Sequence, residues 1–259
     1  MRELVAIAVV ALLTTAHLVE AGEIPPAERR SGTTFMAPDT KAMQDDDTSN
    51  PGMLWVMEAE SLWAKKDGAE NKSCADCHGD ARDSMKGVAA RYPAFDRTLG
   101  RPVDLEQAIN LSRVRHQRAS PLADESRELL ALEAFIAEQS RGMPITAGSD
   151  PQLEPFIEKG HELFTNREGQ LNLSCANCHD DNWDKRLAGS AITQGQPSGY
   201  PLYRLEWQSL GSLQRRLRGC ITGVRAQVFD FGSPEMVELE LYLMTRAAGM
   251  LIESPAVRP

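Results

Sequence analysis

The sequence predicts a mainly α-helical protein built from two similar halves. Apolar residues recur at helical spacing in several segments, of which 54–63 is the clearest, while strand-like alternation is scarce. The five-residue pattern C-x-x-C-H occurs twice, at 74–78 and 175–179, about 100 residues apart. Similar features follow each copy in the same order, as expected of a duplicated chain.

The two C-x-x-C-H motifs predict covalently attached haem. Two thiols at this spacing bond the two vinyl-derived carbons on one edge of a porphyrin, and the next histidine lies beneath the iron as proximal ligand. We therefore expect two c-type haems, each in a crevice between helices. The attachment residues are Cys74, Cys77, Cys175 and Cys178, and the proximal ligands are His78 and His179.

A zinc site and a pair of disulfides are the alternatives for these cysteines. A four-cysteine zinc site would leave both adjacent histidines unused, and its two halves would be much further apart than usual. Paired disulfides suit an oxidising compartment, but they give no reason for a histidine to follow each pair.

The composition is that of a soluble globular protein. The chain has 259 residues, of which 25% are charged and 42% hydrophobic, and its formal net charge is −9. This length suits two domains. The acidic balance argues against nucleic acid as a partner, because phosphate binding requires clustered Lys and Arg.

Residues 1–21 are typical of a secretory signal peptide. Arg2 is followed by an apolar run over 4–13, and Val19-Glu20-Ala21 offers a cleavage site after Ala21. The run is too short to span a bilayer, although an uncleaved anchor remains the alternative. We expect a periplasmic protein that is not embedded in a membrane.

Four segments follow from composition and periodicity. Residues 22–50, rich in Pro, Asp, Thr and Ser, predict an extended N-terminal arm on the surface. Residues 51–145 and 146–259 predict two tandem class I cytochrome c-like domains, joined by a turn-rich linker over 143–151. The expected helices begin at Asn50-Pro51 and then cover 105–116, 125–140, 154–165 and 213–220.

Cys220 is the single cysteine outside the motifs. Four arginines lie within five residues of it: Arg215, Arg216, Arg218 and Arg225. Their charges would lower the pKa of the thiol, favour the thiolate, and attract a small dianion such as thiosulfate. Arg216 shares a helix face with Cys220 at i−4. A buried structural cysteine and a solvated arginine face are the alternatives.

The repeat predicts different distal ligands for the two haems. Twenty residues after Tyr200 stands Cys220, and twenty after Tyr92 stands Ser112. A hydroxyl is a poor iron ligand, and His116 lies one helical turn beyond Ser112, so we expect His116 to ligate the first haem. The remaining alternatives are Met85 and Met143.

From about residue 50 to the C-terminus, the chain resembles the SoxA family. The features that carry this resemblance are the two C-x-x-C-H motifs, the signal peptide and, most specifically, the segment 215–226 (RRLRGCITGVRA). SoxA is the dihaem subunit of the SoxAX cytochrome of sulfur oxidation. The resemblance implies a monohaem partner, SoxX, and an L-cysteine S-thiosulfotransferase activity. That enzyme oxidatively joins thiosulfate to a cysteine thiol of the carrier SoxYZ and passes two electrons to a small cytochrome c.

The resemblance also implies site residues. The family cysteine that matches Cys220 ligates the active-site haem and can carry a persulfide, and an arginine matching Arg216 lies beside it, so both are expected to be catalytic. Ser112 departs from the cysteine found in many relatives. Two alternatives stay open: a thiosulfate dehydrogenase that forms tetrathionate, and a dihaem electron carrier without catalysis.

Overall fold

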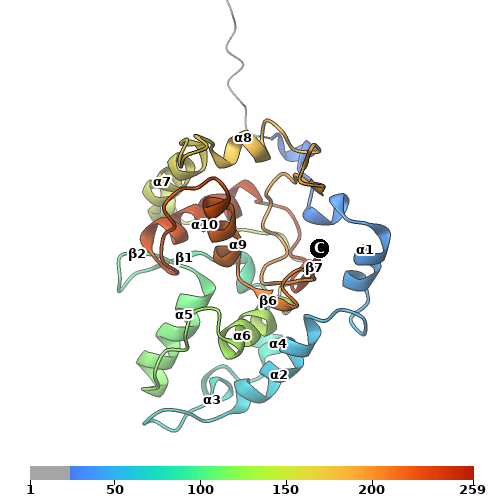
Figure 1. Cartoon of the computed structure of the whole chain (residues 1–259). Coiled ribbons are helices and arrows are strands. Elements are labelled where there is room, and N and C mark those ends of the chain that lie inside the picture. Colours follow the sequence, from blue (N-terminus) through green and yellow to red (C-terminus); the bar gives the residue numbers. More distant parts are fainter. Residues whose placement is uncertain (1–23) are drawn as a thin grey trace, which may run out of the picture.

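The computed structural model describes residues 24–259, which form two helical units with an N-terminal arm along one side (Figure 1). The predicted mainly helical class is confirmed. The predicted signal peptide, residues 1–21, lies outside the described residues. Within 24–259, no helix is both long enough and apolar enough to cross a bilayer.

The arm contains a short helix that the sequence analysis did not anticipate. Pro38 opens this helix, α1 (Pro38–Asp45), and Lys41 Nζ lies 2.6 Å from Asp45 Oδ2 one turn later. Gln44 Oε1 accepts a hydrogen bond from Val257 N (3.2 Å), so the helix holds the chain's last strand. Two 3₁₀ turns precede it, Pro26–Glu28 and Gly32–Phe35.

The N-terminal unit is built on two helices, α2 and α6, that pack against each other. Trp63 of α2 meets Phe135 of α6 edge to face, with ring centroids 5.8 Å apart. The elements are α2 (Met53–Ala64), α3 (Cys74–His78), α4 (Ala81–Ser84), a 3₁₀ turn (Ala89–Arg91), β1 (Ala94–Asp96), β2 (Arg101–Val103), α5 (Leu105–Ser112), a π-helix (Arg113–Gln117) and α6 (Arg127–Glu138).

Capping residues explain where these helices begin. Asp104 caps α5 as expected, accepting a hydrogen bond from Gln107 N (2.7 Å). Helix α2 begins at Met53 rather than at Pro51, after a turn in which Asn50 Oδ1 accepts from Gly52 N (2.9 Å).

The C-terminal unit repeats this plan with α7 and α10. At their crossing, a Cβ on Gly160 would lie 2.1 Å from the Glu238 carbonyl oxygen, so only glycine permits the approach. The elements are a 3₁₀ turn (Pro151–Leu153), α7 (Glu154–Thr165), α8 (Cys175–His179), β3 (Arg186–Leu187), β4 (Ser190–Ala191), β5 (Leu202–Arg204), β6 (Ser209–Gly211), α9 (Leu213–Gly223), α10 (Pro234–Arg246) and β7 (Ala256–Arg258).

The two terminal helices, α6 and α10, start at equivalent serines. Ser233 caps α10 by accepting from Met236 N (3.4 Å), and Pro234 is its first residue. Ser126 caps α6 by accepting from Leu129 N (3.3 Å).

The helical segment that leads from the cap to the turn beside the C-x-x-C-H motif is one residue longer in the first unit (α5 and the π-helix) than in the second (α9). In both units a glycine with positive φ packs closely against this turn. Gly68 lies against the Gln117 carbonyl, and Gly169 lies against the Val224 carbonyl. Gln117 stands thirteen positions after cap Asp104, and Val224 stands twelve positions after cap Ser212. The π-helix accommodates the extra residue of the first unit.

Backbone hydrogen bonds locate this extra residue. The Arg113 carbonyl accepts from the turn that follows it, as the Ile221 carbonyl does in the second unit. The insertion therefore falls after Arg113, within 114–116, and Ser112 is the structural equivalent of Cys220.

The two units are joined by a cluster of carboxyl groups around Gln214. Gln214 Nε2 donates to Asp104 Oδ2 (2.8 Å) and Glu240 Oε2 (3.3 Å). Burial raises the pKa of Asp104 to about 6 and that of Glu240 to about 8. Burial and neighbouring carboxylates also raise the pKa values of Glu106 and Glu133. The carboxyl groups that join the two units therefore keep their protons to a higher pH than ordinary carboxyl groups do.

Candidate functional site

Each C-x-x-C-H motif forms a short helix, and the same kind of capping box caps the N-terminus of both. Ser174 Oγ accepts from Asn177 N (3.2 Å), while Asn177 Oδ1 accepts from Ser174 N (3.1 Å). Ser73 and Asp76 make the same pair of bonds in the first unit. In each unit, the box places the two cysteines in one helical turn with the histidine at its end.

The histidine of the second motif is held from behind. His179 Nδ1 lies 2.7 Å from the Thr193 carbonyl oxygen, and because a carbonyl can only accept, Nδ1 carries the proton. Gly195, at φ +72°, passes so close that a Cβ there would lie 3.1 Å from the imidazole. Nε2 is therefore the nitrogen left to bind a metal.

Helix α9 brings the lone cysteine to this histidine. The Cys220 thiol lies within hydrogen-bonding reach of the His179 side chain. Burial acts to raise the pKa of Cys220, but His179 and the charge of Arg216 outweigh it and lower that pKa. Burial, followed by the nearby Cys220, raises the pKa of Cys175 to about 12. The lone thiol is thus the acidic one in this group.

Two arginines from different elements act on the lone thiol. Arg216 of α9 lowers the pKa of Cys220, and Arg204 of β5 adds to this effect. Burial, followed by the charge of Arg216, lowers the pKa of Arg204. Arg204 also pairs with Glu206 (3.2 Å), so its part is added positive charge, while the Arg216 guanidinium beside the thiolate suits a small dianion. Arg204 was missed from the sequence because it is remote from Cys220 along the chain and belongs to no motif.

The neighbouring arginines of α9 have structural partners. Arg215 stacks on Trp207 with its guanidinium carbon 4.3 Å from the ring centroid, and it pairs with Glu125 at 3.7 Å. Arg218 lies over Phe231 at 4.4 Å and donates to the Phe229 carbonyl. Of the arginines on this helix, Arg216 is therefore the one whose charge acts on the thiol.

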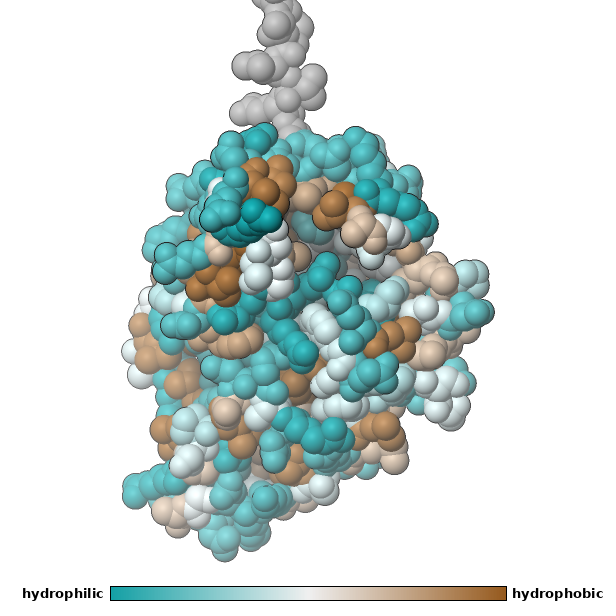
Figure 2. Space-filling view, in the orientation of Figure 1, coloured by the Kyte–Doolittle hydropathy of each residue, from teal (hydrophilic) through white to brown (hydrophobic). Residues whose placement is uncertain are grey.

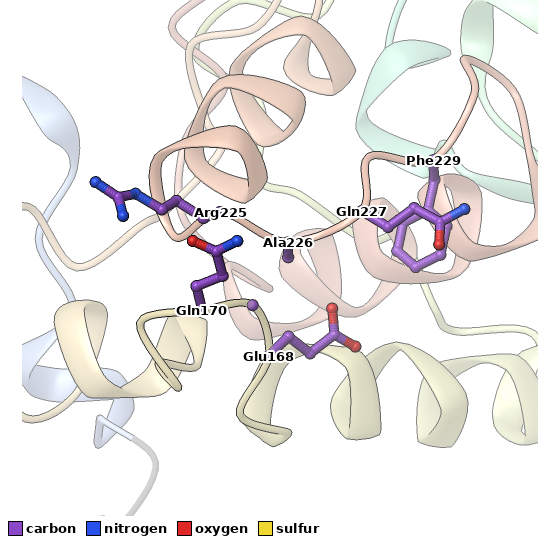
Figure 3. Close-up of a pocket in the computed structure, with 7 residues that line it drawn as sticks. Glu168, Gln170, Arg225, Ala226, Gln227 and Phe229 are labelled. Atoms are coloured by element: carbon purple, nitrogen blue, oxygen red, sulfur yellow. The ribbon is translucent and has the colours of Figure 1, made fainter.

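An open groove of about 640 Å³ adjoins the second motif (Figure 3). Glu168 and Gln170 come from one segment, and Arg225, Ala226 and Gln227 come from the segment that faces it, with the Arg225 side chain directed away from Gln227 and Phe229. Glu168 N donates to the Leu173 carbonyl (3.0 Å), and Leu173 directly precedes the motif's cap Ser174, so the groove lies next to the motif. Its lining is Glu168, Gly169, Gln170, Arg225, Ala226, Gln227 and Phe229.

The first motif has a different surrounding. Gln117 is only 5% exposed, its Nε2 lies 4.0 Å from Cys74 Sγ, and its Oε1 has no partner among the described residues. The His78 ring is exposed and lies 5.8 Å from the Trp63 ring, whose Nε1 donates to the Gly79 carbonyl (2.9 Å). Gln117 is not recognisable as a site residue from the sequence, since the π-helix that directs it inward has no sequence signature.

The predicted distal ligand of the first haem remains a prediction. His116 is exposed in the π-helix, so the one-turn relation to Ser112 that suggested it does not hold as in an α-helix. Of the alternatives, Met85 is buried in the core and Met143 lies against Gly87.

Both sites have donor groups that fit c-type haem. All five cysteines are free thiols, as attachment requires, so the disulfide alternative finds no support. Within residues 24–259, no group of three or more His, Cys, Asp or Glu is arranged to hold a metal ion by itself. At the second motif, the attachment thiols, His179 and Cys220 lie close together.

Hydrophobic residues on the face of the molecule shown in Figure 2 are scattered rather than gathered in one patch.

Two helical units, each with C-x-x-C-H on a short helix, define a tandem cytochrome c. The family model of the SoxA/TsdA cytochrome c domain matches residues 58–145 and 159–252. The L-cysteine S-thiosulfotransferase subunit SoxA of Rhodovulum sulfidophilum is 41% identical over 95% of this chain and 84% of its own length. The chain belongs to the SoxA family.

Other relatives agree with this assignment. The SoxA subunit of Pseudaminobacter salicylatoxidans is 40% identical over 90% of this chain and 82% of its own length. The crystal structure of SoxXA from P. pantotrophus contains a chain that superposes with a TM-score of 0.86 at 33% identity, covering 89% of this chain and 87% of that one. The predicted family, tandem cytochrome c fold and enzyme class are confirmed, and the family implies haem.

Proposed function

We propose that this chain is the dihaem, thiosulfate-coupling subunit of a periplasmic L-cysteine S-thiosulfotransferase. It joins thiosulfate to a cysteine thiol of a SoxYZ-type carrier, and a small cytochrome c receives the two electrons. One observation supports this most: the Cys220 thiol lies beside His179 under the charges of Arg216 and Arg204.

The side chains have distinct roles in this reaction. Arg216 and Arg204 bind the thiosulfate dianion and orient its outer sulfur toward Cys220. The Cys220 thiolate forms a sulfur–sulfur bond with that atom while two electrons leave. The carrier thiolate then attacks the transferred sulfur, and Cys220 departs as thiolate, ready for the next cycle. Bound haem supplies the one-electron steps that carry the electrons away.

The groove of Figure 3 provides a route for the carrier. It is open and adjoins the second motif. Its walls carry Arg225 and Glu168, together with the amide of Gln170, which suits a polar peptide arm that ends in a cysteine. The carrier thiol would therefore reach the transferred sulfur from this side.

The remaining parts of the proposal concern assembly. Two haems are attached covalently, through Cys74 and Cys77 and through Cys175 and Cys178, with His78 and His179 as proximal ligands. Cys220 would supply a further iron ligand to the second haem, and His116 would supply one to the first. The chain pairs with a SoxX-type monohaem subunit, and it is exported with cleavage after Ala21.

Substitution of the lone thiol tests the function. The Cys220→Ala holoprotein is assayed with its monohaem partner, a SoxYZ-type carrier, thiosulfate and ferric cytochrome c. We expect turnover to fall by several orders of magnitude, as it does when a nucleophile is removed. Mass spectrometry of the variant should still show two covalent haems, and the carrier should lack the thiosulfonate adduct.

The first unit offers the matched control. Ser112→Ala alters the equivalent position of α5 and should leave turnover unchanged. Normal turnover of Cys220→Ala would overturn the catalytic assignment. Formation of tetrathionate without a carrier would instead indicate a thiosulfate dehydrogenase, and cytochrome reduction that requires no thiosulfate binding would indicate a simple electron carrier.

A further inference from the structure

A buried ion pair lies directly behind the second motif. Arg246, the last residue of α10, is only 6% exposed, and its Nη2 donates to Asp180 Oδ1 at 2.8 Å. Asp180 follows His179 in the chain. Two charges this deeply buried require each other, because removing either one would leave its partner without compensation.

The same guanidinium reaches the loop that holds the proximal histidine. Arg246 Nη2 also approaches the Gln194 carbonyl at 3.3 Å. Gln194 follows Thr193, whose carbonyl accepts the His179 Nδ1 proton. Arg246 Nη2 therefore connects Asp180, which follows His179, to Gln194, which follows Thr193.

The N-terminal arm fixes the far side of this loop. The Gln194 side chain is fully buried; its Oε1 accepts from Arg30 N (2.6 Å) and its Nε2 donates to the Glu28 carbonyl (3.1 Å). Arg30 also lies over Trp183, 5.0 Å from the ring centroid. The carbonyl that Arg246 meets is thus held between α10 and the arm.

The first unit lacks this connection. Glycine, Gly79, follows its motif histidine where Asp180 stands in the second unit. Counted from the capping serines, the residue equivalent to Arg246 is Gln139, directly after α6, and its Nε2 donates to Phe135 O (3.0 Å) of that helix. The ion pair is therefore a feature of one site, not a requirement of the fold.

We propose that Arg246 is a positioning residue that joins Asp180 to the Gln194 carbonyl and thereby fixes the hydrogen bond from His179 to Thr193. A hydrogen bond at Nδ1 makes the imidazole a stronger electron donor through Nε2, which favours the oxidised metal. Arg246 therefore sets the redox equilibrium of the second haem without touching it. The inference rests on the proposed function only in requiring haem at the second motif.

Reduction potentials of the holoprotein test this role. In Arg246→Gln, which introduces the residue of the first unit, we expect the equilibrium constant for reduction of the second haem to rise about tenfold, or 59 mV for one electron. The first haem should not change. Arg246→Lys keeps the charge opposite Asp180 but loses the planar fork, so its shift should be smaller.

A control on the same helix pair separates tuning from stability. Lys159→Met removes the 3.3 Å ion pair between Lys159 Nζ and Glu238 Oε1, which also joins α7 to α10. It should lower stability and leave both potentials unchanged. An equal shift of the second potential in Lys159→Met and Arg246→Gln would overturn the inference, as would unchanged potentials in both Arg246 variants.

Asp180→Asn provides a second route if Arg246→Gln does not fold, because it weakens the pair and leaves Arg246 in place. It should shift the second potential in the same direction. If neither variant assembles, the pair serves folding alone and the tuning role is wrong. Absence of haem from the second motif of the unaltered protein, counted by mass spectrometry, would instead overturn the proposed function.

Discussion

Helices α5 and α9 occupy the same place in the two units, yet they present different chemistry to the motif beside them. Four residues and eight residues after its cap, α9 carries Arg216 and Cys220. At the same positions α5 carries Ala108 and Ser112. A guanidinium and a thiol in one unit are thus a methyl group and a hydroxyl in the other.

The surroundings of the two motif histidines also differ, and again the second unit is the more elaborate. His179 donates to Thr193 O, and Arg246 fixes the surrounding loop. His78 instead lies beside Trp63, and its ring is exposed. The helix crossing and the capping boxes are shared, so the scaffold is common to both units. The groups suited to sulfur chemistry are gathered in the second unit, and we infer that the first serves electron transfer.

After the loss of Cys220 itself, the largest effect is expected when Arg216 of α9 is replaced by the alanine that α5 carries at the equivalent position, Ala108. Arg216→Ala removes the charge that helps to bind the anion and to ionise Cys220. Loss of a charged hydrogen bond of this kind should reduce kcat/KM for thiosulfate about 10- to 100-fold. Steady-state assays at several thiosulfate concentrations measure this, and Arg216→Lys should recover part of the loss.

The adjacent arginine is the matched control for Arg216. Arg215→Ala removes a side chain that stacks on Trp207 and pairs with Glu125, so it should affect stability more than thiosulfate kinetics. Equal losses of kcat/KM in the two variants would mean that general positive charge, rather than the position of Arg216, binds the anion.

The first haem gives the next prediction. If the inserted residues 114–116 supply its distal ligand, His116→Ala should convert one iron of the holoprotein from low spin to high spin. Electron paramagnetic resonance and the visible spectrum measure this change. Val114→Ala, in the same π-helix, should leave both spectra unchanged. An unchanged spectrum in His116→Ala would exclude His116, and Gln117, next to Cys74, would be examined next.

Local signals in the sequence predicted much of this molecule. Helix α7 spans the expected residues 154–165, and Asp104 caps α5 as its type and position indicate. The pairing of Ser112 with Cys220 followed from the repeat. These features depend on neighbouring residues, which a sequence displays directly.

The features that the sequence did not reveal depend on contacts between remote segments. The charge of Arg204, on β5, helps to lower the pKa of Cys220, and Thr193 meets His179 from an irregular loop. The π-helix arises from a single added residue, which a count of residues from Tyr92 cannot locate. Such contacts are created by tertiary packing and have no local pattern.

The smallest effect concerns the joint between the units. Glu240 has an ordinary pKa of 4.5 and a folded pKa of about 8, so the folded chain holds a proton there that the unfolded chain releases. Its contribution to stability is complete below pH 4.5 and is lost as the pH rises through 8. Glu240→Gln, which mimics the protonated group, should raise the free energy of unfolding at pH 8 by about 1 kcal/mol or more.

Urea unfolding of the wild type and of Glu240→Gln across this pH range measures the difference. The gain should be near zero at pH 4.5 and grow toward pH 8. Asp104→Asn should show its gain over a lower window, because its folded pKa is about 6, although it also weakens the cap of α5. A gain that is independent of pH would mean that Glu240 is ionised in the folded protein and that the two units are joined by charge rather than by shared protons.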